Sequence, residues 1–169
     1  IDLTPGGAPY AANAAMNNPG APMTPASSPP ESKRRSVYLP VVRNDLPDVF
    51  QVFDFVDPHA INGRRHATTA APQALYLMNS PFVLEQAREW ARQLLDSPSG
   101  ADRDRVARAF LQASGRPAGS REVEATLAFL ANYQTDLAKK SSDAESNRLK
   151  AWQSFCQALF ASTEFRYLE

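Results

Sequence analysis

The apolar pattern near the C-terminus constrains the fold of this chain more than any other feature. Six apolar residues recur there at intervals of three and four: Leu149, Trp152, Phe155, Cys156, Leu159 and Phe160. An α-helix with this spacing carries all six side chains on one face, and that face must be buried against other elements. The pattern therefore predicts an amphipathic helix after the polar stretch 139–146, packed into a core.

Helical periodicity also precedes this segment. It is present in four further stretches: 72–78, 81–96, 102–114 and a helix that begins at residue 120. Ser80 and Ser120 are expected to cap helices, Pro81 suits a first helical position, and Gly115 is expected to end the third stretch. The connections are short, which favours antiparallel neighbours. Residues 72–169 are therefore predicted to form a small antiparallel bundle of four to five helices.

The first 32 residues are of a different kind. Residues 1–30 contain one formal charge, at Asp2, and half of the 14 prolines of the chain. Such a stretch buries too little apolar surface to offset the entropy of ordering it. It is predicted to be a flexible or extended Pro/Ala/Gly/Ser-rich arm.

Residues 33–71 are predicted to form an irregular segment with little strand. Residues 35–43 suit a short extended segment, and Pro40 confines it to a sheet edge. Pro47 is expected to open a short helical turn, after which residues 52–56 suggest a strand or extended run. A polar loop follows to residue 71. With the arm and the bundle, this makes a mainly α chain in three parts.

The composition excludes several classes of protein. Lys plus Arg and Asp plus Glu both number 18, so the basic surplus typical of a nucleic-acid-binding domain is missing. No apolar stretch approaches the length of a membrane span. The single cysteine, Cys156, cannot form an internal disulfide or a CxxCH haem attachment, and it lies among core residues. No cofactor site is predicted, and the start at Ile1 suggests part of a longer protein.

The histidines do not form a convincing metal site. His59 and His66 share a loop with Asp57, but a zinc site needs three or four ligands at compatible spacing. The neighbouring arginines would also oppose a cation. We expect both histidines to be exposed or bonded locally, and we predict neither a metal site nor a catalytic one.

The most distinctive polar feature is the loop 62–73, which contains Arg64 and Arg65. With Arg43 and Asp54 these residues are the candidate ligand-binding set, suited to a phosphate, a sugar acid or a partner carboxylate. The alternative is structural: the side chains bond loop carbonyls, and Asp54 forms salt bridges with the arginines.

The order of several short motifs resembles a known family. The motifs are Arg35-Ser-Val-Tyr38, Phe53-Asp54, Thr68-Thr69, Pro72-Gln-Ala-Leu75, Asn79-Ser-Pro-Phe-Val83, Gly115-Arg-Pro117 and Ser162-Thr-Glu-Phe165. Together they resemble the planctomycete-type C-terminal domain catalogued as number 1553 among domains of unknown function, over residues 33–168. The opening residues 1–7 resemble a stretch inside that domain, which implies that the chain is its C-terminal portion.

The resemblance implies context rather than chemistry. Such domains end large exported proteins, so an extracytoplasmic location is expected, in the periplasm or at the cell surface. Haem c, where present, would belong to an upstream cytochrome-c-like module. The leading hypothesis is a non-catalytic structural or interaction domain whose partners are upstream domains or a partner subunit. The alternatives are a polysaccharide- or anion-binding module, using Tyr38 or Tyr76, and half of a composite enzyme site.

Overall fold

The computed structural model describes residues 48–56, 70–98 and 100–166. The chain divides into two compact units, residues 1–73 and 74–169. The described residues form seven helices and no strand, so the prediction of a mainly α chain is confirmed. No helix in these ranges is long and apolar enough to cross a membrane. The predicted arm and the segment 35–43 lie outside the described residues.

In the first unit the structure describes helix α2 (Asp48–Val52) and the turn after it. The predicted short helical turn is confirmed. Residues 52–56 do not form the predicted strand or extended run, because Val52 ends α2 and residues 53–54 form a turn. Asp54 adopts a left-handed backbone conformation with φ of 50°, and the Phe55 N–H donates to the Phe50 carbonyl at 2.8 Å. The chain therefore turns back, and the Phe55 ring stacks on the buried Phe50 ring with centroids 5.0 Å apart.

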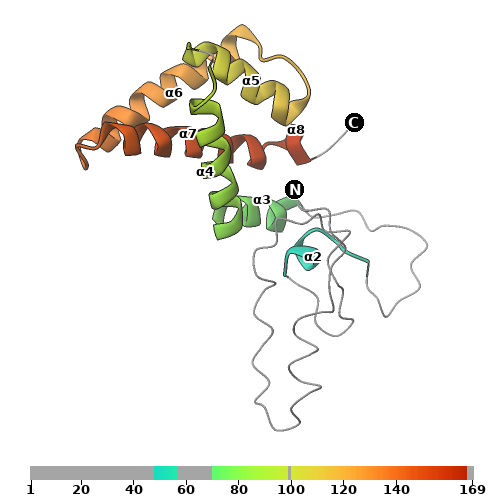
Figure 1. Cartoon of the computed structure of the whole chain (residues 1–169). Helices are drawn as coiled ribbons and strands as arrows, with labels where there is room; N and C mark the ends of the chain where they lie inside the picture. Colours follow the sequence, from blue (N-terminus) through green and yellow to red (C-terminus); the bar gives the residue numbers. More distant parts are fainter. Residues whose placement is uncertain (1–47, 57–69, 99, 167–169) are drawn as a thin grey trace. The chain divides into compact units, whose positions relative to one another are not determined.

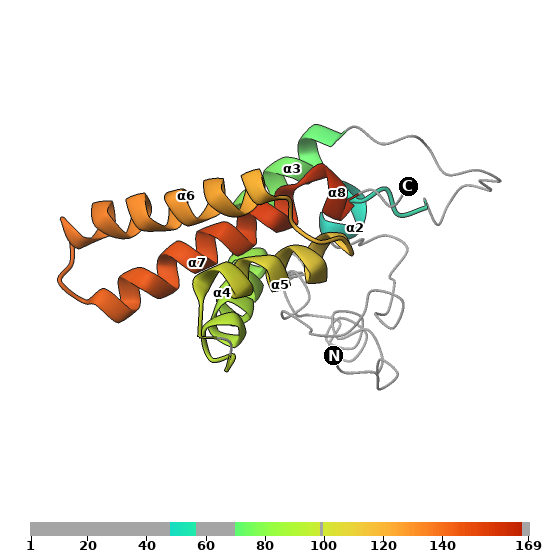
Figure 2. The same cartoon turned by 90° about the horizontal axis from the view of Figure 1, so that it is seen from above.

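The second unit is a helical bundle in which four helices share one core. The helices are α3 (Ala70–Asn79), which begins before the boundary between the units, α4 (Pro81–Leu95), α5 (Asp102–Ser114), α6 (Ser120–Ala138), α7 (Ala144–Ala161) and the short α8 (Thr163–Arg166). Helix α7 packs against α4, α5, α6 and α8. Helices α6 and α7 lie side by side and antiparallel (Figure 2), whereas α4 crosses α7 (Figure 1).

The core confirms the apolar pattern that predicted α7. Trp152 and Cys156 are fully buried, and Phe155 and Leu159 are nearly so. On α4, Ala87 and Ala91 are also fully buried, as is Ala151 on α7. Small side chains at a helix crossing let the two backbones approach closely. The aromatic side chains of α7 can then fill the space beside the contact.

The helix ends partly follow the predictions. Pro81 starts α4 and Gly115 ends α5 in a left-handed conformation with φ of 70°, which glycine adopts without strain. Ser80 is the N-cap residue of α4, as predicted, but its side chain makes no cap hydrogen bond. The predicted Ser120 cap is wrong: Ser120 is the first residue of α6, and the N-cap is Gly119, whose N–H donates to Glu122 at 2.7 Å. A capping box has two hydrogen bonds, and only this one can form here, because glycine has no side chain to accept a bond from the Glu122 N–H.

The start of α7 has a cap that the sequence analysis missed. The Asp143 carboxylate accepts a hydrogen bond from the Ser146 N–H at 3.1 Å. This satisfies one of the free N–H groups of the first helical turn, and it separates α7 from the loop at 139–143.

Candidate functional site

Three of the four predicted ligand-binding residues, Arg43, Arg64 and Arg65, lie outside the described residues, as do His59 and His66. The fourth, Asp54, is half-buried in the turn after α2. Its Oδ2 atom is buried and has no hydrogen-bond partner within the described part of the chain. The predicted binding set therefore stays a prediction, with Asp54 as its one described member.

A buried arginine on α5 organises the connection between α4 and α5. The Arg105 guanidinium donates to the Leu94 carbonyl at 3.1 Å and to the Gly100 carbonyl at 3.2 Å. It also donates to the Asp102 carboxylate at 2.9 Å, and Asp102 accepts a second bond from Arg148 of α7 at 2.7 Å. Carbonyls at a helix C-terminus lack partners within the helix. Arg105 supplies donors to these carbonyls, so its guanidinium stabilises the fold.

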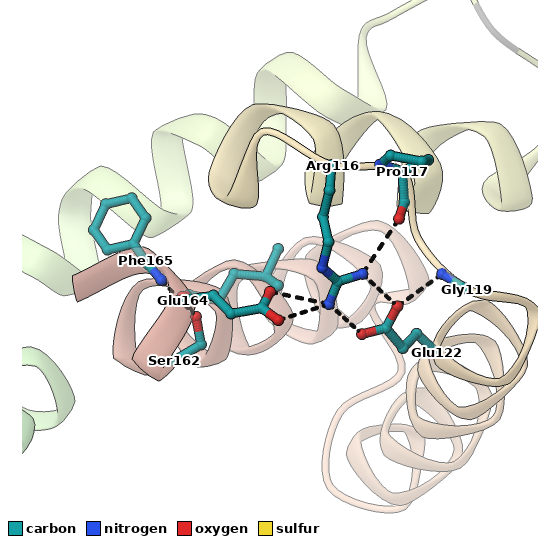
Figure 3. A network of polar contacts seen from close by, with 8 residues as sticks. Arg116, Pro117, Gly119, Glu122, Ser162, Glu164 and Phe165 are labelled. Carbon is teal, nitrogen blue, oxygen red and sulfur yellow. Dashed lines mark hydrogen bonds and ion pairs between the residues drawn. The ribbon is translucent and has the colours of Figure 1, made fainter. Parts of the chain in front are cut away.

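A second arginine, Arg116, lies in the connection between α5 and α6 and gathers two carboxylates (Figure 3). Its Nη1 and Nη2 atoms donate to the two oxygens of Glu122 at 2.9 and 2.7 Å. Its Nη2 atom also donates to both oxygens of Glu164 on α8, each at 2.9 Å. The cluster therefore joins the start of α6 to the last described helix.

The electrostatics of this cluster follow from those bonds. The hydrogen bond from Arg116 lowers the pKa of Glu122 to about 2, and the Gly119 N–H adds to the effect. Glu122 and Glu164 in turn raise the pKa of Arg116. All three side chains remain partly exposed to solvent, between 36% and 53%. The cluster thus consists of paired charges at the surface.

An aromatic ladder lies beside the cluster. The Trp90 ring of α4 stacks on Phe160 of α7, with centroids 5.2 Å apart and an interplanar angle of 22°. Phe160 in turn contacts Phe165 of α8, with centroids 5.1 Å apart. The Trp90 Nε1 atom donates to Gln112 of α5 at 2.9 Å. The chain after α7 thus packs back onto the bundle at Phe165.

Two glutamines of α7 donate to backbone carbonyls at the end of α3 and near the start of α4. Gln153 donates to the Leu84 carbonyl at 3.1 Å, and Gln157 donates to the Met78 carbonyl at 2.7 Å. Both bonds join segments about seventy or more residues apart in the chain, so no local sequence pattern announces them. They use the polar edge of α7 for packing rather than for ligand binding.

The described residues contain no group of three or more His, Cys, Asp and Glu side chains that could hold a metal ion. Burial raises the pKa of the Cys156 thiol to about 12, so the thiol stays protonated at neutral pH. A protonated, buried thiol is a poor nucleophile. The prediction that Cys156 is a core residue is confirmed by its complete burial.

Exposed apolar side chains are the remaining feature of interest. On α3, Leu75 is 62% exposed and Met78 is 58% exposed, and the ten residues of this helix include no charge. On α5, Leu111 is 55% exposed, but that helix carries five charged residues. The outward side of α3, with Leu75 and Met78 three residues apart, is called the α3 face below.

No curated protein and no solved structure matches the chain. A family model described as "PSD1: Protein of unknown function (DUF1553)" matches residues 3–130. The match begins earlier than the predicted similarity over residues 33–168, includes most of the opening stretch, and ends within α6. It covers most of the chain, and its number is that of the family to which the motifs pointed. The chain therefore belongs to the DUF1553 family of proteins of unknown function.

Proposed function

We propose that the chain is a non-catalytic structural and interaction domain of a larger exported protein. It would pack against upstream domains of the same polypeptide or against a partner subunit. The family itself carries no assigned function. The extracytoplasmic location and an upstream cytochrome-c-like module belong to this proposal through the family resemblance.

The α3 face is the observation that supports the proposal most directly. Exposed apolar side chains on a helix without charge favour burial against another surface, because moving Leu and Met side chains out of water lowers the free energy. The two arginines with the most hydrogen bonds do not suggest a ligand-binding site instead, because their donors are used within the chain. Arg105 donates to backbone carbonyls and Arg116 to two carboxylates of the same chain.

A crosslinking experiment in the full-length parent protein tests the proposal. A photoreactive amino acid is placed at Leu75, and in a matched variant at Leu111, which is similarly exposed but lies on a charged helix. We expect crosslinks from position 75 to another domain or subunit, and few from position 111. Equal yields from the two positions, or none from position 75, would contradict the proposal.

A pair of substitutions separates interaction from folding. Leu75→Glu with Met78→Glu should leave the helical content of the isolated chain unchanged, since both side chains are largely exposed. In the parent protein the same pair should make the chain more accessible to proteolysis, because a buried charge without a partner opposes docking. A parent protein that is as resistant as the wild type would show that the α3 face is not an interface.

A further inference from the structure

Two neighbouring side chains of α8 contact the bundle, and each contacts a different residue. The Glu164 carboxylate meets the Arg116 guanidinium, and the Phe165 ring contacts Phe160 (Figure 3 shows Glu164 directed toward Arg116 and Phe165 directed away from it). Arg116 and Phe160 are called the α8 seat below. A carboxylate followed by an aromatic ring is therefore the chemical pattern that the seat holds.

The seat is oriented by residues that do not belong to α8. Glu122 takes two hydrogen bonds from Arg116, and the Pro117 carbonyl takes a third at 3.2 Å. Trp90 stacks on the Phe160 ring and is itself held by its bond to Gln112. Both anchors thus have supports on α4, α5 and α6 or their connections. Pre-oriented groups lose little freedom when an occupant binds.

Helix α8 itself is held weakly. It has four residues, none of them buried, and Phe165 is 40% exposed. The carboxylate of Glu164 is paired at the surface, where ion pairs contribute little to stability. Ser162, which joins α7 to α8, has an extended backbone with φ of −67° and ψ of 153°. Short, exposed elements of this kind open locally without unfolding the core.

From these observations we propose that α8 is an exchangeable occupant of the seat. The seat recognises a short segment in which an acidic residue precedes an aromatic one, and α8 fills it within the chain. When α8 opens, a segment of the same chemistry from a binding partner takes its place. This surface is formed by residues other than those of the α3 face, and the proposal does not depend on that face.

The occupant within the chain is favoured because it is tethered. A short tether holds a segment at an effective concentration of about 1 mM, so a free segment of equal intrinsic affinity competes poorly. Weakening the tethered segment should therefore expose the seat to a free one. This gives the proposal a test that needs no identified partner.

The test uses the full chain and a fluorescent peptide with the sequence of residues 162–169. The peptide is titrated against wild type and against an open variant, Glu164→Ala with Phe165→Ala, and anisotropy is recorded. We expect the open variant to bind the peptide at least about tenfold more tightly than the wild type does, because the tethered competitor is weakened. Equal binding to both proteins, or none to either, would overturn the proposal.

Two matched controls establish that the seat is responsible. Adding Arg116→Gln to the open variant should weaken peptide binding by up to about fivefold, because the carboxylate loses its charged donor in a solvent-exposed ion pair. A peptide with glutamine in place of its glutamate should be weakened similarly. Binding that is unaffected by Arg116→Gln would place the peptide elsewhere and refute the assignment.

Hydrogen exchange of the wild-type chain gives an independent measurement if the open variant folds poorly. The Phe165 N–H donates to the Ser162 hydroxyl at 3.3 Å, whereas the amides around Trp152 lie in the core helix. We expect the α8 amide to exchange by local opening, at least about a hundredfold faster than the Trp152 amide. Exchange of both amides at one common rate would mean that α8 opens only with the whole bundle, against the proposal.

Discussion

Two arginines, one at each end of α5, show how burial changes the role of one side chain. Arg105 is 9% exposed and donates mainly to backbone carbonyls of the connection after α4. The Arg116 side chain is 41% exposed and donates mainly to carboxylates of α6 and α8. A buried arginine that donates to carbonyls stabilises the fold, since its removal leaves buried acceptors without a hydrogen-bond donor. An exposed arginine between carboxylates holds a contact that water can replace.

Removing the buried arginine should give the largest effect. Arg105→Ala leaves the Leu94 and Gly100 carbonyls without their donor and should lower the free energy of unfolding by about 2–3 kcal/mol. Chemical denaturation followed by circular dichroism measures this. Arg103→Ala, at an exposed position of the same helix, is the control and should stay within about 0.5 kcal/mol of wild type. Equal losses of unfolding free energy in the two variants would show that burial does not give Arg105 a structural role.

The rate at which a reagent labels the buried Cys156 thiol is a second way to compare the loss of Arg105 with the loss of Arg116. Cys156 is fully buried and its pKa is raised to about 12, so a thiol reagent at pH 8 should label it only through opening of the bundle. Arg105→Ala should accelerate labelling about 30- to 150-fold, the factor that corresponds to 2–3 kcal/mol. Arg116→Gln should leave the rate near that of wild type. Fast labelling of native wild type would show that the thiol is accessible after all.

The same thiol predicts a loss of stability at high pH. Its folded pKa is raised, so its contribution is complete below the unfolded value near 9 and is lost as pH rises toward about 12. Cys156→Ala should therefore flatten the alkaline limb of the stability profile between these values. Denaturation midpoints measured from pH 8 to pH 11 check this, and identical slopes for the two proteins would contradict it.

Removing the exposed arginine should have a local effect. Arg116→Gln weakens the contact between the α5–α6 connection and α8, while the core around Trp152 is untouched. Hydrogen exchange should therefore rise at Phe165 and at Gly119, with little change in the α7 core and little change in the denaturation midpoint. A large drop of the midpoint would place Arg116 with Arg105 as a structural residue.

The smallest expected effect is the acid response of the same cluster. The folded pKa of Glu122 is lowered to about 2 from an ordinary value near 4.5. Its contribution to stability is therefore complete above about 4.5 and is lost as pH falls toward 2. Because the carboxylate is exposed, the slope should be shallow. Comparing wild type with Glu122→Gln by denaturation from pH 6 to pH 2.5 measures it, and parallel curves would show that the ion pair does not stabilise the fold.

The sequence by itself determined the class of fold and most of its helices. Apolar residues at intervals of three and four mark α4, α5, α6 and α7, because only one face of each helix can be buried. Pro81 and Gly115 mark helix boundaries through their own backbone preferences. These signals are local, and the family similarity is carried by the order of short motifs, so both can be found without a structure.

The tertiary structure decided how the polar residues are used. Arg105 lies in the first turns of α5 and Arg116 in the Gly115-Arg-Pro117 connection, and neither local sequence identifies the partners of its arginine. Only the packing shows that Arg105 is buried against carbonyls while Arg116 faces carboxylates 6 and 48 residues away. Ser80 is at the N-cap position of α4 but makes no side-chain cap bond, and at the start of α6 the Glu122 side chain, rather than Ser120, bonds the N–H of the N-cap residue Gly119. A polar side chain can choose among many partners, and that choice depends on long-range geometry that no short sequence pattern encodes.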